Sequence, residues 1–226
     1  MFISKYSGSD ILSGMTARNR ANPLALAILT CLHERPMHPY EVAQTLRSRA
    51  KHESIRLNYG SLYSVVEGLA GRGLIEPQET VREGKRPERT VYAITPLGVR
   101  ELTDWLSELV STPAKEYLQF EAALSLLPGL PPDDALELLR LRANALEIRV
   151  RQSEATNELA RDHGLPRLFM LENEYGDGLL RAELDFVHTL ITDLETGKLE
   201  GLEEWRGWYV DDDAPRQWFP TEENER

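Results

Sequence analysis

Three helix signals follow one another within residues 22–73, and helices this short cannot bury their apolar faces alone. In "NPLALAILTCLHERP", Asn22 can cap the first helix, Pro23 suits its first turn and Pro36 follows its end. The second signal is "HPYEVAQTLRSR". The third, "LNYGSLYSVVEGLAGRG", has Asn58 as its cap and glycines at its end. The pattern predicts a small core made of three packed helices.

Two β-favouring runs follow the third helix signal and flank a basic segment. One run begins at Leu74 and the other, "TVYAI", covers residues 90–94, with "VREGKRPER" between them. Thr95 then opens a fourth helix, which we expect to end near Val110 and to pack through Leu97, Leu102, Trp105, Leu106 and Leu109. The order of helix, helix, helix, strand, basic loop and strand is that of a winged helix-turn-helix domain, a mainly α fold with a two-stranded wing.

The charge of the chain is unevenly distributed. The 226 residues carry a net charge of −11, which by itself argues against binding to nucleic acid. Residues 1–110 have 14 basic and 12 acidic residues, so their net charge is +2, and the remaining residues carry −13. Between Arg47 and Arg100 there are ten basic and six acidic residues. The first half can therefore hold a surface that attracts phosphates.

The third helix signal has one apolar face and one face of small residues. At 100° per residue, the apolar stripe consists of Leu62, Val65, Val66 and Leu69. The opposite face carries Gly60, Ser64, Glu67, Gly68 and Gly71. Such a face allows close approach, either to another helix inside a protein core or to the major groove of DNA. The basic segment that follows favours DNA.

Several side chains around this helix can contact phosphates or bases. Hydroxyl groups can donate to phosphate oxygens, and a helix N-terminus favours an anion. The candidate DNA-binding residues are Tyr40, Asn58, Tyr59, Gly60, Ser61, Tyr63, Ser64 and Glu67 in the helices, and Arg82, Lys85, Arg86 and Arg89 in the basic segment.

Three segments of the chain resemble the signature segments of the PadR family of winged-helix transcriptional regulators, in order and in spacing. They are "PMHPYEVAQTL", "LNYGSLYSVVEGLAGRGLIE" and "RTVYAITPLG". Two later segments, "QFEAALSLLPGLPPDDALELLRLRANALEIR" and "LPRLFMLENEYGDGLLRAELDFVHTLITDLETG", are similar to the virulence-activator-like C-terminal domain of one PadR branch. The resemblance covers about residues 22–197.

The resemblance implies a homodimeric regulator, most simply a repressor, on a palindromic double-stranded DNA operator. By analogy with the family, a small-molecule effector of unspecified identity would act through the C-terminal dimer. The resemblance also places Asn58, Ser61 and Tyr63 in the DNA-reading helix and Lys85, Arg86 and Arg89 in the wing. Pro39 and Ser64 depart from the family pattern, which usually has glycine and proline there. Pro39 suits a helix start, whereas Ser64 on the groove side can change the base preference.

The second half of the chain predicts two long helices with two apolar stripes each. The first helix has the stripes Leu139/Ala143/Leu146/Val150 and Leu138/Leu141/Ala145/Ile148, and the second has Leu168/Tyr175/Leu179/Ala182/Phe186 and Leu180/Leu184/Val187/Ile191. A helix that is apolar on two sides needs two partners, and we expect the second partner to be another subunit rather than a ligand. The expected parts are an extension at 1–21, a winged-helix domain at 22–112, a helical dimerisation and effector domain at 113–197, and an acidic tail at 198–226.

Two features of the second half have no simple place in this scheme. Gly176 and Gly178 lie within a helix, where each costs about 1 kcal/mol relative to alanine, so either the helix bends there or the gap admits a partner side chain or a small ligand. We favour packing. The acidic tail keeps Trp205, Trp208 and Trp218, which are unusual in disordered acidic segments, so we expect it to dock on its own subunit or on a partner.

An enzyme is the main rival class of protein. The sequence has no G-x-S-x-G elbow, phosphate loop or H-E-x-x-H motif, and the histidines (His33, His38, His52, His163 and His188) have no metal-ligand spacing. We therefore expect no catalytic residues, no metal and no cofactor, and we expect His38 to cap or pack a helix. A winged-helix protein–protein adaptor that does not bind DNA is the stronger alternative, although an adaptor does not need a basic wing.

The single cysteine and the absence of long apolar segments bear on location. Cys31 lies in the apolar stretch "LALAILTCL", so we expect a small buried side chain rather than a reactive thiol. One cysteine excludes an intrachain disulfide framework, and the chain has neither a signal-peptide pattern nor a stretch of membrane-spanning length. We expect a cytoplasmic protein without a membrane partner.

Overall fold

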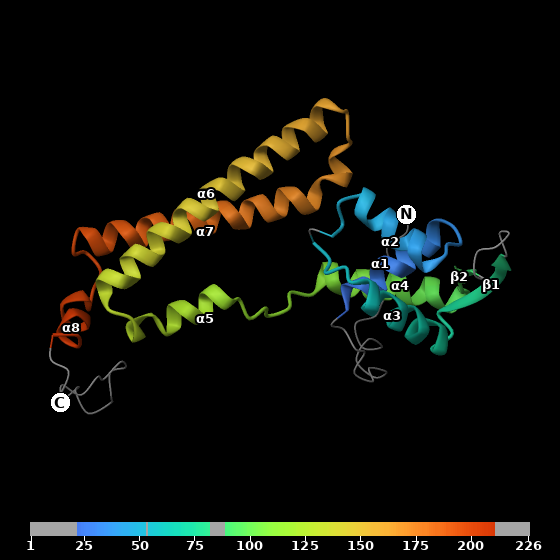
Figure 1. The fold of residues 1–226 in the computed structure, drawn as a ribbon, viewed down its shortest axis with the longest axis horizontal. Helices are drawn as coiled ribbons and strands as arrows, with labels where there is room; N and C mark the ends of the chain where they lie inside the picture. The colour runs from blue at the N-terminus through green and yellow to red at the C-terminus, as the bar shows by residue number, and fades with distance from the viewer. Residues whose placement is uncertain (1–21, 53, 82–88, 211–226) are drawn as a thin grey trace, which may run out of the picture. The chain divides into compact units, whose positions relative to one another are not determined.

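The computed structural model describes residues 22–52, 54–81 and 89–210 (Figure 1). Its contacts divide the chain into two units, Met1–Lys115 and Glu116–Arg226.

The first unit has the predicted order of helices and strands. Its elements are α1 (Pro23–Glu34), α2 (Pro39–Ser48), α3 (Tyr59–Gly71), β1 (Ile75–Val81), β2 (Arg89–Ile94) and α4 (Pro96–Ser111). α1 lies centrally and contacts α2, α3, α4 and β2, so it forms the middle of the core. Ile28 and Leu29 of α1 and Leu62 of α3 are completely buried there. The predicted three-helix core is confirmed.

The helix starts are fixed by the side chains that the sequence suggested. The Asn22 side chain accepts a hydrogen bond from the backbone N–H of Leu24, and Asn58 accepts one of 2.9 Å from Gly60. His38 caps α2, because its Nδ1 accepts from the N–H of Tyr40 while its own N–H donates to the Glu41 carboxylate. The expected capping role of His38 is thus confirmed.

Cys31 lies in the core of the first unit. Its side chain is only 1% exposed, and burial raises the pKa of the thiol. A thiol in this environment stays protonated and packs as a small apolar group. The expectation of a structural rather than a reactive cysteine is confirmed.

The two strands form an antiparallel pair whose base is anchored to the helices. Ile75 pairs with Ile94 at the base, and the register shifts between Pro77 and Glu79. The segment between α1 and α2 joins this pair through Met37 and Tyr92, whose backbones exchange two hydrogen bonds of 3.0 Å. The start of α2 and the base of the wing are therefore tied together.

The start of α4 is held tightly against the turn between α3 and β1. Thr95 caps α4 by accepting from the N–H of Gly98, and its hydroxyl donates to the carbonyl of Gly73 at 2.7 Å. A Cβ on Gly98 would lie 2.0 Å from the carbonyl oxygen of Leu74. Only glycine fits at this position.

A methyl group at residue 98 is therefore expected to destabilise the first unit. Gly98→Ala should lower its free energy of unfolding by at least about 2 kcal/mol, since the clash is with backbone atoms. Denaturant unfolding of the full-length protein measures this change. Gly71→Ala is the matched control, because a Cβ there meets nothing within 4 Å and should not destabilise. Equal stability of the two variants would contradict the prediction.

The prediction of the packing face of α4 is wrong in part. Leu102 and Trp105 are buried, but Leu97, Leu106 and Leu109 are exposed. Leu106 and Leu109 continue the buried face toward the end of α4, where the described residues of the unit no longer cover it. Leu97 lies in the first turn of α4, at the edge of this face rather than within it.

The second unit is built around a long helical hairpin (Figure 1). Its elements are α5 (Gln119–Ser125), the short 3₁₀ helix η1 (Leu127–Gly129), α6 (Pro132–Asp162), the 3₁₀ helix η2 (Arg167–Phe169), α7 (Leu171–Glu195) and α8 (Leu202–Gly207). α6 and α7 run side by side along the hairpin. Arg142 of α6 lies over the ring of Phe120, which attaches α5 to the hairpin.

The two apolar stripes of each long helix behave differently. One stripe of each helix faces the hairpin core, with Leu139, Ala143 and Leu146 buried in α6 and Val187 buried in α7. The other stripe of each helix is exposed, including Leu138, Leu141 and Ile148 in α6 and Tyr175, Leu179 and Phe186 in α7. Leu168, which was predicted to start the second stripe of α7, is exposed but lies before that helix, in η2. Each long helix thus presents one face to its neighbour and leaves a second apolar face uncovered by the described chain.

A polar cluster interrupts the hairpin core. Asn157 of α6 is buried, and it donates to the carboxylate of Asp177 in α7, as does the hydroxyl of Ser153. Asn173 donates to the side-chain oxygen of Asn157 at 3.2 Å. The polar groups in this part of the hairpin satisfy one another.

The two glycines that flank Asp177 are part of one continuous helix, α7. A Cβ on Gly176 or on Gly178 would meet nothing within 4 Å. The packing that we expected at these glycines is therefore not made within the described chain.

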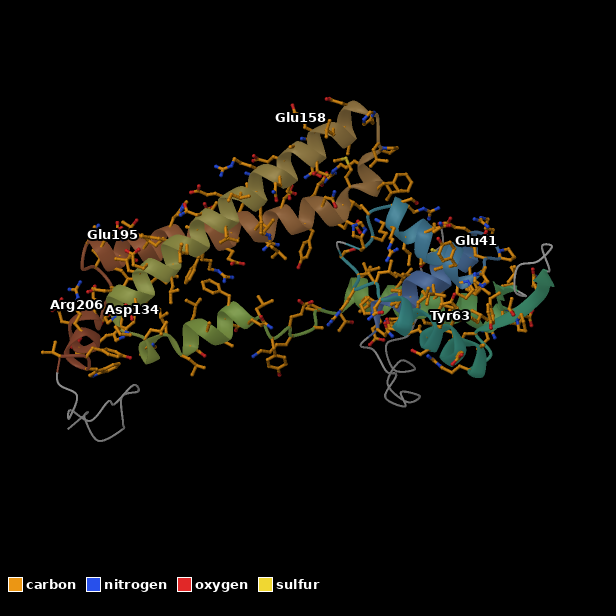
Figure 2. All side chains as sticks on the ribbon, in the orientation of Figure 1. Glu41, Tyr63, Asp134, Glu158, Glu195 and Arg206 are labelled. Carbon is orange, nitrogen blue, oxygen red and sulfur yellow. The ribbon has the colours of Figure 1, made fainter. Side chains whose placement is uncertain are left out.

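The described part of the acidic tail docks on its own chain. Leu202 and Trp205 of α8 are buried, and the indole N–H of Trp205 donates to the carbonyl of Leu130 at 2.8 Å. α8, which carries Arg206 (Figure 2), contacts α6. The expectation that the tail docks is confirmed for α8.

Candidate nucleic-acid interface

The outward face of α3 is exposed and nearly smooth. Gly60, Ser64, Glu67 and Gly68 are exposed, while Leu62, Val66 and Leu69 hold the opposite side of the helix in the core. Tyr63 is 46% exposed and lies on α3 at the surface of the first unit (Figure 2). The helical period therefore places the expected groove-side residues on one accessible face.

The glycines of this face do not serve packing within the described chain. A Cβ on Gly68 or on Gly71 would meet no atom within 4 Å. Glycine costs about 1 kcal/mol in a helix, and open space offers no local gain for it. Of the two explanations for the small face, contact with an external partner is the one that fits this geometry.

Hydroxyl groups on α3 are already engaged with the backbone. Ser61 donates to the carbonyl of Asn58 at 2.9 Å, and Ser64 donates to the carbonyl of Ser61 at 3.1 Å. In this arrangement both serine oxygens can still accept a hydrogen bond, and donation to a phosphate requires rotation of the hydroxyl. Glu67 is exposed and can only accept while it is ionised.

A cavity of about 350 Å³ lies beside the N-terminus of α3. Arg56, Asn58 and Ser61 line one side of it, and residues 22–24 at the start of α1 line the other. The guanidinium of Arg56 and the N-terminus of α3 both favour an anion. Arg56 is not among the predicted site residues, although a basic residue just before a helix cap was a usable signal.

Arg49 and Arg72 of the first unit are engaged in ion pairs with acidic residues of the same unit. Arg49 makes a two-point contact with the Glu34 carboxylate at 2.5 and 2.7 Å, which lowers the pKa of Glu34. Arg72 pairs with Glu101 at 2.9 Å. These two arginines support the fold. The excess of basic residues between Arg47 and Arg100 therefore overstates the positive charge that is available to a phosphate backbone.

The remaining candidate residues are placed only in part. Tyr40 is exposed in the first turn of α2, Tyr59 is the first residue of α3, and Arg89 is the first residue of β2. Arg82, Lys85 and Arg86 lie outside the described residues. The structure therefore brings Gly60, Ser64 and Glu67 onto one face of α3 and leaves the contribution of the wing as a prediction.

The first unit matches a family of known proteins. Residues 28–104, which run from α1 into α4, match the model of the transcriptional regulator PadR-like family. The chain carries a PadR-like domain. The family is one of transcriptional regulators rather than enzymes. A search of curated proteins gives no match.

Solved structures share the fold of this chain. PadR of Bacillus subtilis in complex with operator DNA is 16% identical, with a TM-score of 0.63, over 76% of this chain and 99% of that one. A PadR-like transcriptional regulator of Bacillus cereus is 15% identical, with a TM-score of 0.54, over 77% and 99%. The protein smu.1604c of Streptococcus mutans is 21% identical, with a TM-score of 0.53, over 76% and 99%. A mainly α fold, with a PadR-like winged helix and a C-terminal helical region, is confirmed.

In the described ranges, no helix is both long enough and apolar enough to cross a bilayer.

Proposed function

We propose that this protein is a sequence-specific DNA-binding transcriptional regulator, acting as a repressor and as a homodimer on a palindromic operator. The observation that carries the proposal is the exposed, small-residue face of α3, whose Gly68 and Gly71 meet nothing in the chain. This face belongs to a PadR-like domain, and one protein of similar fold is PadR of Bacillus subtilis in complex with operator DNA. In the proposal α3 enters the major groove, which is wide enough for a helix.

The chemistry of α3 supports sparse direct readout of bases. Ser64 can accept or donate, and Glu67 can accept from the exocyclic amino group of cytosine. Asn58, Tyr63, Arg56 and the helix N-terminus lie where phosphates would pass. Affinity would come mostly from phosphate contacts and from the spacing of two half-sites.

The second unit supports dimerisation in this proposal. The exposed stripes of α6 and α7 form apolar faces that a second copy can cover. A small-molecule effector would change the dimer and thus the distance between the two reading heads. The likeness to PadR of Bacillus subtilis in complex with p-coumaric acid supports an effector of this kind without identifying it.

Sequencing of retained genomic fragments tests the proposal directly. The full-length protein is incubated with sheared DNA from its own source, and the fragments that it retains are sequenced. We expect a shared inverted repeat whose half-sites are about 10 base pairs, or a multiple of this, apart. Retention without sequence preference, or no retention, would contradict the proposed function and favour a protein–protein adaptor.

The wing is expected to contribute through phosphates. If Arg86 neutralises one phosphate, Arg86→Ala should weaken binding similarly on every sequence and reduce the slope of log K against log salt by about one. Titrations at several salt concentrations measure the slope. Arg149→Ala, which removes one charge from the second unit, should leave the slope unchanged. A loss of sequence preference at constant slope would show that Arg86 reads bases.

A further inference from the structure

An apolar cavity of about 410 Å³ lies in the second unit, between η1, α7 and α8. Its lining includes Leu124, Leu127, Phe186, Leu190, Trp205 and Trp208. Phe186 remains 50% exposed beside it. A concave surface of this composition favours an apolar occupant, because filling it removes aromatic and aliphatic surface from water.

The chain leaves the described structure at the rim of this cavity. The hydroxyl of Tyr209 donates to the carbonyl of Pro128 at 2.8 Å, and Pro128 lines the cavity. Trp208, the preceding residue, also lines it. The position of Val210, and therefore the starting point of the remaining segment, is fixed next to the opening.

The remaining segment, "DDDAPRQWFPTEENER", contains one compact apolar group. Trp218, Phe219 and Pro220 are flanked on both sides by polar and acidic residues. Seven residues lie between Val210 and Trp218, and an extended chain over these eight steps spans at most about 26 to 29 Å. Ala214 and Pro215 suit a reversal of direction between the rim and the aromatic pair. The aromatic pair can therefore return to the cavity at the start of its own segment.

One pair of opposite charges suits the same arrangement, although the segment between Val210 and Trp218 also carries three aspartates. Glu200 lines the cavity, and it is exposed to solvent. Arg216 is the only basic residue between Val210 and Trp218. With the aromatic side chains inside, Arg216 would lie at the opening, where it can pair with the Glu200 carboxylate.

We propose that Trp218 and Phe219 of the same chain fill this cavity, with Arg216 beside Glu200. The tail then extends the docking already made by Trp205 and Tyr209. A second copy is the weaker occupant, because the long exposed stripes of α6 and α7 offer it a larger surface, whereas this cavity opens where the tail begins. The proposal goes beyond DNA binding and does not depend on it.

Disulfide trapping in the full-length protein tests the proposed contact. In the variant Glu200→Cys/Arg216→Cys, mild oxidation should form a disulfide within one chain, which non-reducing gels and mass spectrometry identify. Buried Cys31 should remain a thiol. The short segment between the two cysteines allows some contact even without docking. The decisive comparison is therefore between this variant and the same variant with Trp218→Ala and Phe219→Ala added. We expect this addition to slow trapping at least about tenfold. Equal rates, or trapping only between chains, would overturn the proposal.

Two matched truncations provide an independent measurement. A chain that ends at Pro220 keeps the aromatic pair, and a chain that ends at Gln217 lacks it. The shorter chain should bind more of the dye 8-anilinonaphthalene-1-sulfonate and should melt about 3 to 8 °C lower. The chain that ends at Pro220 should match the full-length protein. Identical behaviour of the two truncations would overturn the proposal.

Discussion

Replacing Gly68 by leucine is expected to weaken binding to the retained DNA fragments at least about 100-fold, equivalent to about 2.7 kcal/mol. The leucine side chain would project from the smooth face of α3 and hold the helix away from the groove floor. Within the protein the change is harmless, because a Cβ at this position meets nothing within 4 Å. Leucine also has a better helix propensity than glycine by almost 1 kcal/mol. Gel shifts or fluorescence anisotropy measure the loss.

The control for Gly68→Leu places the same side chain elsewhere on the same domain. Thr103→Leu adds a leucine to the exposed side of α4 and should bind DNA like the parent. Ser64→Leu should reproduce the defect of Gly68→Leu. Circular dichroism should show unchanged helical content in all three variants. Parent-like binding by both α3 variants would mean that α3 does not enter the groove.

Replacing Leu141 by glutamate is expected to raise the dissociation constant of the dimer at least about 100-fold. Leu141 is 65% exposed in the single chain, so the fold tolerates a charged side chain there. In a symmetric dimer, however, the change would bury two like charges along the exposed stripe of α6. Sedimentation velocity of the full-length protein measures the change. Since a monomer contacts only one half-site, the affinity for the operator should fall by about 100- to 1,000-fold as well.

Asn144→Glu is the matched control for this interface. It adds a carboxylate to the same part of α6, outside both apolar stripes. It should therefore leave the oligomeric state unchanged. A parent protein that sediments as a monomer at micromolar concentration would remove the basis of the prediction, and equal effects of the two variants would assign the effect to charge alone.

Features that depend on neighbours along the chain could be predicted from the sequence. Caps such as Asn58 act over two or three residues, and the stripes of α3, α6 and α7 follow from helical period alone. Most of the candidate face could be placed for the same reason. Its glycines could not be assigned to an external partner until the empty space beside Gly68 was visible.

Features that depend on distant segments were not predictable. The pair of Arg49 with Glu34 joins two helices, and the close contact between Gly98 and Leu74 depends on how α4 meets the preceding turn. The exposure of Leu109 likewise depends on where the rest of the core ends. The cavity beside Arg56 was not predictable either, because its other side is formed by residues 22–24 at the start of α1.

The polar cluster at Asn157 and Asp177 limits how the hairpin can transmit a signal. If α7 slid along α6 by one helical turn, about 5.4 Å, the carboxylate of Asp177 would move away from at least one of its two donors and toward Val150 or Ala160 of α6. The hydrogen bonds of this cluster thus fix the axial register of the two helices. A stimulus at one end of the hairpin would therefore reach the other end as the tilt or rotation of a rigid lever, and not as the sliding of one helix past the other.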